Sequence, residues 1–162
     1  MSGSKARPRT AARVAAVQAL FQAEQAQISA ETVIDEFIRH RLGSLSADDG
    51  YEEGRVPDAH APLFARIVRA AIQRQDAIDL LIADALAEDW PISRLDPVLR
   101  AVMRAGVAEL GMTDGPPARV VINEYLDVSH GFFMGDEPRM ANGVLDKLAR
   151  QIRPQDFVAA ES

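Results

Sequence analysis

Residues 96–110 constrain the fold of this chain more than any other segment. Asp96-Pro97 places an N-cap residue before proline at the first helical position, a pair that strongly signals the start of a helix. The apolar residues that follow occupy almost every side of that helix: Val98, Leu99, Val102, Met103, Val107 and Leu110. Because a helix that is apolar nearly all round is usually buried, we expect this segment to be the central helix of a helical core.

The remaining segments repeat the same helical spacing of apolar residues and contain no convincing strand pattern. The first helix is expected from Ala11, with Thr10 as its N-cap. Taken together, the expected helices span residues 11–27, 30–42, 58–90 with a bend or break at 73–76, 97–109, 118–128 and 138–153. The third run counts as two helices, so the sequence predicts an all-α, single-domain bundle of about seven helices.

Composition divides the chain into a helical domain, residues 10–153, which contains one loop insertion, and two terminal segments. Residues 1–9 are polar and basic, and we expect a flexible arm there. Residues 44–57 are acidic, contain glycine and end in proline, as expected of a loop insertion. Residues 154–162 have no helical pattern and are expected to be a flexible tail. Trp90, the only tryptophan, is expected to fill space in the core or between helices.

The dipeptide Asn142-Gly143 lies inside the last expected helix. Glycine in a helix interior costs about 1 kcal/mol relative to alanine, so some feature of the fold must require the missing side chain. We expect another helix to pack closely against Gly143, and the Asn142 amide to cap or bridge helices.

Charge and motifs exclude several functions. The net charge is -6, yet every charged residue before Glu24 is basic, which suggests a basic arm on an acidic body or simply a solvated tail. The chain has no cysteine and no nucleotide-binding, metalloprotease or hydrolase motif, and its three histidines are far apart. We therefore expect no enzyme activity, catalytic residue, cofactor or metal site. No apolar run is long enough for a membrane span, in keeping with a cytoplasmic protein.

Four blocks of sequence, in order, resemble the NusB family of transcription antitermination factors. They are RVAAVQALF at 13–21, RLDPVLRAVMRAGVAEL at 94–110, PARVVINEYL at 117–126 and NGVLD at 142–146. The resemblance implies an all-helical fold that binds single-stranded boxA RNA of rRNA leader transcripts with the ribosomal protein NusE. Together they help the elongation complex of RNA polymerase resist termination. Family members occur as monomers or dimers, so a homodimer is possible.

The resemblance also implies which residues meet each partner. The RNA-binding candidates are Lys5, Arg7, Arg9, Arg13, Gln18, Phe21, Phe132, Asp136 and Arg139. The candidates for NusE are Asp79, Asp84, Glu88, Asp89 and Arg104. Phe21 lies on an apolar stripe, so it either stacks on a base or belongs to the core. Asp136 either accepts from a base or caps the next helix. Met140 stands where the family has an aromatic residue, and either contacts RNA or belongs to the core.

Two other functions remain open at this point. One is a protein-interaction scaffold whose basic arm is incidental. The other is a domain like the RNA-recognition domain of an rRNA cytosine methyltransferase, although the chain has no room for that enzyme's methyl-donor domain.

Overall fold

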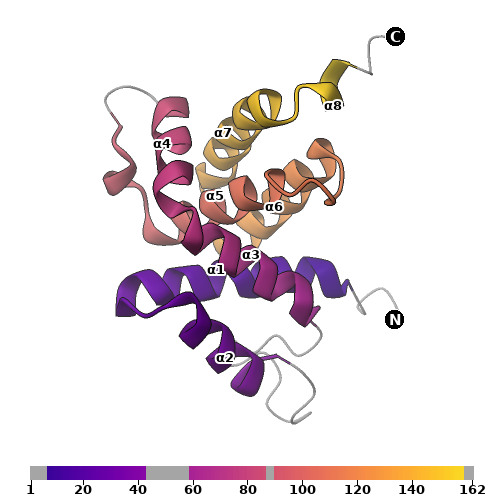
Figure 1. The fold of residues 1–162 in the computed structure, drawn as a ribbon. Coiled ribbons are helices and arrows are strands. Elements are labelled where there is room, and N and C mark those ends of the chain that lie inside the picture. The colour runs from indigo at the N-terminus through magenta and orange to yellow at the C-terminus, as the bar shows by residue number, and fades with distance from the viewer. Residues whose placement is uncertain (1–6, 43–58, 87–89, 159–162) are drawn as a thin grey trace. The chain divides into compact units, whose positions relative to one another are not determined.

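The structure is a computed structural model that describes residues 7–42, 59–86 and 90–158. All regular elements in these ranges are helices (Figure 1). The chain forms two compact units, residues 1–73 and residues 74–162. The all-α prediction is confirmed, and the seven expected helices correspond to α1–α7. The expected loop at 44–57 lies outside the described residues.

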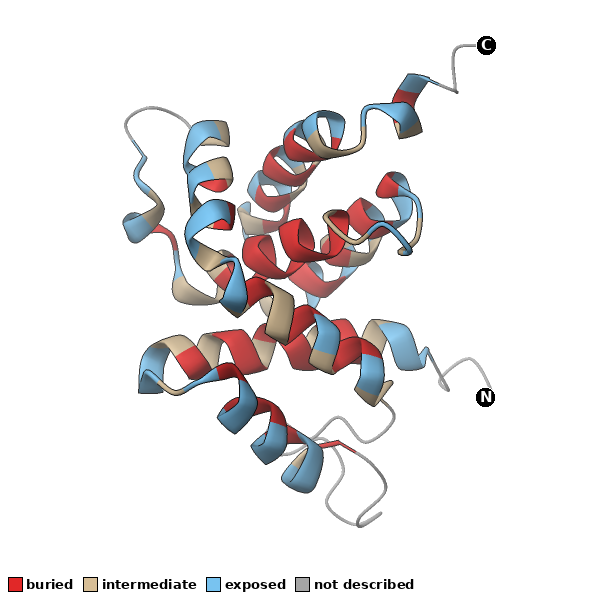
Figure 2. Cartoon of the chain, in the orientation of Figure 1, coloured by how far each residue is buried: buried red, intermediate tan, exposed pale blue. Residues whose placement is uncertain are grey.

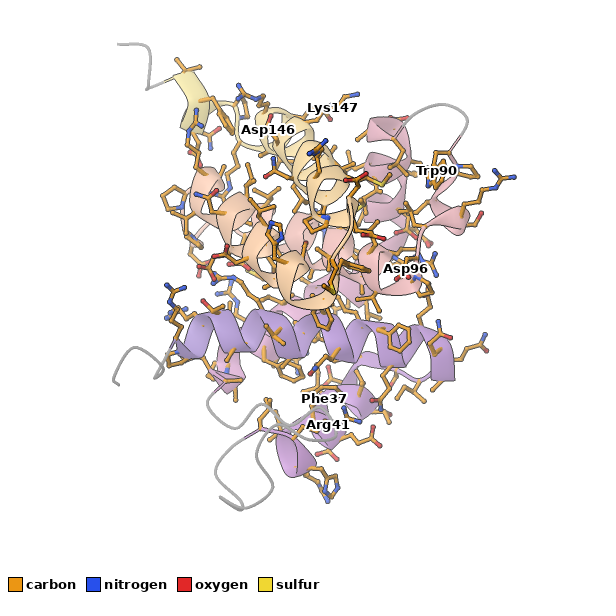
Figure 3. The ribbon with its side chains drawn as sticks, turned by 180° about the vertical axis from the view of Figure 1, so that it is seen from behind. Phe37, Arg41, Trp90, Asp96, Asp146 and Lys147 are labelled. Carbon is orange, nitrogen blue, oxygen red and sulfur yellow. The ribbon has the colours of Figure 1, made fainter. Side chains whose placement is uncertain are left out.

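The first unit contains α1 (Pro8–Ala26), α2 (Ala30–His40) and α3 (Ala61–Gln73), and α1 packs against both other helices. Its core includes the stacked rings of Phe37 and Phe64, whose centroids lie 5.5 Å apart. The Arg41 guanidinium covers the Phe37 ring at 4.6 Å (Figure 3). Arg69 Nε pairs with Glu31 Oε2 at 2.7 Å and links α3 to α2.

Helix ends in the first unit follow local chemistry. Ser29 Oγ accepts from the Thr32 amide at 3.1 Å, which confirms the predicted N-cap of α2. The predicted start of α1 at Ala11 is wrong. The helix begins at Pro8, so Thr10 lies inside the helix and is not its N-cap. Proline suits that position since its φ is preset and it has no amide hydrogen to satisfy. Arg9, assigned to a flexible arm, therefore belongs to α1.

The second unit contains α4 (Gln75–Ala85), the 3-10 helix η3 (Ile92–Arg94), α5 (Pro97–Leu110), α6 (Ala118–Phe132), α7 (Glu137–Ile152) and α8 (Gln155–Val158). Every residue from Ala101 to Leu110 is buried (Figure 2). Helix α5 packs against α4, α6 and α7, so the prediction that it is central is confirmed for this unit. The break expected at 73–76 is also confirmed, since α3 ends at Gln73 and α4 begins at Gln75.

The close helix contact lies at Gly106 of α5 and not at Gly143. A Cβ atom at Gly106 would lie 2.8 Å from Leu145 Cδ2, so α7 approaches α5 too closely for a side chain there. Gly143 is exposed and a Cβ there would meet no atom within 4 Å. The prediction for Gly143 was wrong because the residue lies on the outer side of α7. Among the described residues no hydrogen bond involves the Asn142 side chain, so its predicted role as cap or bridge is also wrong.

The tail predicted after Pro154 is wrong for residues 155–158, which form α8. Asp156 Oδ2 accepts from the Ala118 amide at 2.9 Å and thereby caps the start of α6. Phe157 is buried between the guanidinium groups of Arg119 and Arg150, at 5.0 and 4.5 Å. These contacts join residues distant in sequence, so helical periodicity could not reveal them. Helix α6 also continues past Gly131 to Phe132, whereas the sequence predicted an end near Val128.

Candidate functional site

The N-terminus of α1 carries two of the RNA-binding candidates in exposed positions. Arg7 occupies the N-cap and Arg9 lies in the first turn; both are exposed, and Lys5 lies outside the described residues. The first turn has no acidic residue and no side-chain cap. The partial positive charge of a helix N-terminus disfavours cations, so Arg7 and Arg9 lie where they do not help the fold. Such a concentration of positive charge attracts anions.

Three further candidates on α1 are less accessible. Arg13 is buried, with 4% of its surface exposed, and it already has interaction partners. Gln18 and Phe21 are half-buried, and Gln18 Oε1 has no hydrogen-bond partner among the described residues. Phe21 is thus neither a fully buried core residue nor a freely exposed ring. The part of α1 that is open to an anion is therefore its first turn.

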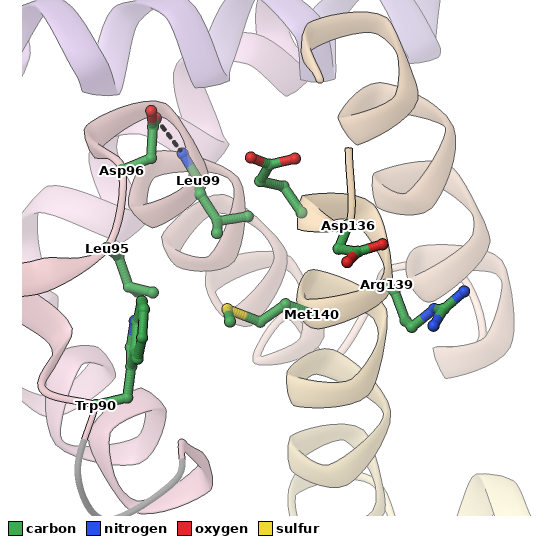
Figure 4. Close-up of a pocket in the computed structure, with 8 residues that line it drawn as sticks. Trp90, Leu95, Asp96, Leu99, Asp136, Arg139 and Met140 are labelled. Carbon is green, nitrogen blue, oxygen red and sulfur yellow. Dashed lines mark hydrogen bonds between the residues drawn. The ribbon is translucent and has the colours of Figure 1, made fainter. Parts of the chain in front are cut away.

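A cavity of about 580 Å³ opens in the second unit beside the N-terminal turns of α5 and α7 (Figure 4). Apolar side chains and acidic or basic side chains both line it: Trp90, Leu95, Leu99 and Met140 are apolar, and Asp96, Asp136, Glu137 and Arg139 are charged. The Met140 side chain extends toward α5, whereas Arg139 points to the other side of α7. Trp90 was expected either in the core or between helices; it is 42% exposed, so the core alternative is wrong, and it forms a wall of this cavity.

Hydrogen bonds around Asp96 fix the α5 side of the cavity. Asp96 Oδ1 accepts from the amides of Val98 and Leu99 at 2.7 and 3.3 Å, as its predicted role of N-cap requires. Arg100 Nη1 donates to the Leu95 carbonyl at 2.9 Å and so holds the connection from η3 against α5. Both leucines are buried, and they present a rigid apolar surface to the cavity.

The α7 side of the cavity supplies two carboxylates. Asp136 occupies the N-cap position of α7, yet its side chain makes no capping hydrogen bond. Of the two readings of Asp136, capping is therefore wrong, and the exposed carboxylate can accept from a ligand. Glu137 Oε1 is buried and has no hydrogen-bond partner in the described part of the chain. Phe132, half-buried at the end of α6, does not line the cavity.

Two of the candidates for a protein partner bind each other instead. Arg104 donates through Nε and Nη2 to Asp79 Oδ1 and Oδ2, both at 2.8 Å, and this pair joins α5 to α4. The Arg104 side chain is 9% exposed, so the pair belongs to the packing of the unit. Asp84 is exposed on α4, and Glu88 and Asp89 lie outside the described residues.

Sequence reasoning missed Trp90 and Glu137 as parts of the cavity. Trp90 was expected only to fill space in the core or between helices, and Glu137 directly follows Asp136, which is one of the RNA-binding candidates. Within residues 7–42, 59–86 and 90–158, no three acidic or histidine side chains are grouped to hold a metal ion. No helix in these ranges has the length and hydropathy needed to cross a bilayer.

These features define a class of protein: an all-α protein with a cationic helix end and a partly apolar cavity. The comparisons with known proteins specify it further. A model of the NusB family matches residues 10–150, and the chain belongs to this family. The transcription antitermination protein NusB of Granulibacter bethesdensis is 66% identical over 153 residues, which cover 94% of each chain. That of Gluconobacter oxydans is 58% identical over 145 residues, 90% of this chain and 88% of the relative.

A solved structure agrees with this assignment. The structure of T. maritima NusB superposes with a TM-score of 0.73 at 25% identity, covering 94% of this chain and 99% of the other. The curated relatives are named as antitermination proteins and not as enzymes.

Proposed function

We propose that this chain is a cytoplasmic transcription antitermination factor that binds boxA RNA of rRNA leader transcripts together with the ribosomal protein NusE. In this role it helps the elongation complex of RNA polymerase resist termination. Membership of the NusB family and the names of the relatives support the proposal. A second support is the first turn of α1, where exposed Arg7 and Arg9 add to the positive end of the helix.

The exposed arginines would bind the RNA backbone. Arginine binds phosphate through several donors in a fixed geometry, and release of counterions makes such binding sensitive to salt. For single-stranded RNA, each neutralised phosphate contributes about -0.7 to the slope of log K against log salt. Arg13 is left out of this contact because it is buried and already has partners.

The residues at the cavity would contact bases. The Asp136 carboxylate has no capping role, so it can accept from the exocyclic amino group of an unpaired base. Arg139 is exposed in the first turn of α7 and would bind a neighbouring phosphate. The thioether of Met140 replaces a stacking ring with a flexible apolar contact, for which an aromatic base is a suitable partner.

For NusE, the acidic character of the chain provides charge complementarity, because ribosomal proteins are typically basic. Asp84 is the exposed candidate within the described residues. Such complementarity affects association rate more than affinity. Asp79 and Arg104 would act indirectly, since their ion pair holds α4 on α5.

Fluorescence anisotropy with labelled boxA RNA and scrambled RNA of equal length, with and without NusE, tests the proposal. We expect selective binding to boxA that NusE strengthens. Replacing Arg9 by glutamine should weaken binding and lower the magnitude of the salt slope by about 0.7. Replacing Arg39 on α2 by glutamine removes the same charge from an exposed site and should leave binding unchanged.

Equal affinity for boxA and scrambled RNA in both conditions would refute the proposed function. The alternative hypothesis, that the chain is a protein-interaction scaffold, would then be favoured. One observation favours that alternative: three carboxylates beside apolar side chains in the cavity suit a basic protein segment.

A further inference from the structure

Two consecutive residues in the middle of α7, Asn142 and Gly143, are not explained by contacts within residues 74–162. Gly143 is exposed, and a Cβ placed on it would meet no atom within 4 Å. The Asn142 side chain takes part in no hydrogen bond among the described residues. Glycine is the poorest helix former after proline, and asparagine is also below average. A reason for this pair must therefore be sought outside the packing of the unit.

Cationic side chains flank Gly143 on the same side of α7. Arg139 and Lys147 lie four residues before and after it, and residues four apart share a helix face. Both are exposed. With a rise of 1.5 Å per residue, the two cations are about 12 Å apart along the axis, with the bare backbone of Gly143 between them.

Nearby acidic groups reduce this positive charge only partly. Asp146 Oδ2 pairs with Arg150 Nε at 3.1 Å, so its charge is largely offset. On α6, which packs against α7, Glu124 is half-buried with a partner, and Asp127 is exposed. Lys147 and Arg139 have no ion pair within the described residues.

We propose that this face of α7, centred on Gly143, holds the sugar–phosphate backbone of single-stranded RNA. The inference rests on the proposed function and extends the RNA path along α7 beyond Asp136 and Arg139. Without a Cβ at Gly143, a strand can lie close enough to the helix for both cations to reach its phosphates. The Asn142 amide then donates to the same strand. A protein partner fits less well, because lysine is depleted from the centres of protein interfaces.

The test uses the full-length protein with labelled boxA RNA and NusE. Gly143→Gln fills the open position without changing the charge, and Lys147→Gln removes one cation. Losing one phosphate contact at a slope of about -0.7 should weaken binding about fourfold at 0.15 M salt. We expect that loss for Lys147→Gln, with a smaller salt slope, and a similar or larger loss for Gly143→Gln with an unchanged slope. Ala83→Gln adds the same side chain to an exposed position of α4 and serves as the matched control.

The outcomes separate this inference from the proposed function. If the wild type does not distinguish boxA from scrambled RNA, the proposed function fails, and this inference fails with it. If the wild type binds selectively and Arg9→Gln weakens binding, but Gly143→Gln and Lys147→Gln bind as the wild type does, only this inference is overturned. Loss of NusE binding with RNA binding intact would make this face a protein interface and also overturn it. Glutamine is a better helix former than glycine, so Gly143→Gln should not lower the melting temperature.

Discussion

Replacing glycine by alanine should have opposite effects at Gly106 and Gly143, although both lie inside helices. Alanine gains about 1 kcal/mol of helix propensity at either position. At Gly143 nothing opposes this gain, because the new methyl group meets no atom within 4 Å. At Gly106 the methyl group would lie 2.8 and 2.9 Å from the two Cδ atoms of Leu145, which is fully buried and has little room to move. Overpacking of a core costs about 1–3 kcal/mol.

The expected net changes follow from these two contributions. Gly143→Ala should raise the free energy of unfolding by about 1 kcal/mol. Gly106→Ala should lower it by about 0–2 kcal/mol, the cost of overpacking less the propensity gain. Urea denaturation followed by circular dichroism measures both, with equal m-values as the check that only stability has changed.

A double variant tests the cause. In Gly106→Ala/Leu145→Val, the smaller valine leaves room for the new methyl group. The double variant should therefore be more stable than the sum of the single changes predicts, by about 0.5–3 kcal/mol. Equal stabilisation by alanine at both glycines, or a destabilised Gly143→Ala, would refute this account of the α5–α7 contact.

Three further changes test other contacts. Tyr125→Phe removes the 2.9 Å hydrogen bond to the buried Glu109 carboxylate and should lower the free energy of unfolding by about 1–3 kcal/mol in chemical denaturation, and an unchanged free energy of unfolding would contradict this prediction. Asp156→Ala removes the cap of α6 and should lower the free energy of unfolding by about 0.5–2 kcal/mol. Faster hydrogen exchange of the Ala118 amide would show that the effect lies at this cap, and unchanged exchange would contradict the prediction. The hydrogen bond from Arg69 lowers the pKa of Glu31 below its ordinary 4.5, so this pair stabilises the fold above that pH and the contribution is lost as pH falls through the lowered pKa. Glu31→Gln should therefore reduce the loss of stability on acidification, and an identical pH profile in wild type and variant would contradict the assignment.

Periodicity predicted the helices of this chain because each helix buries an apolar stripe that is continuous in sequence. Helix α5 is the clearest case, since its capping pair and its apolar residues are adjacent in the chain. Helix α8 was missed because its stability comes from Arg119, Arg150 and Ala118, which lie on other helices. A four-residue helix has no periodicity from which to predict it.

The candidate site was predicted less completely, for a related reason. Sequence identifies which residues are charged but not which of them are already paired. Asp79 and Arg104, assigned to a protein partner, form a two-point ion pair 25 residues apart in the chain. The sequence left two roles open for Asp136, accepting a hydrogen bond from a base or capping α7, and only the geometry of its side chain distinguishes them. Trp90 was expected in the core or between helices, yet it is one of the exposed large apolar residues, so only the first alternative is wrong.

The two roles of Asp96 have a consequence for how this cavity can evolve. The residue caps α5 and also contributes a negative charge to the cavity. Asparagine and serine cap helices about as well as aspartate but carry no charge. A single substitution of this kind would change the electrostatic potential of the cavity at almost no cost to folding. The charge that the cavity presents can therefore change without any compensating change in the scaffold.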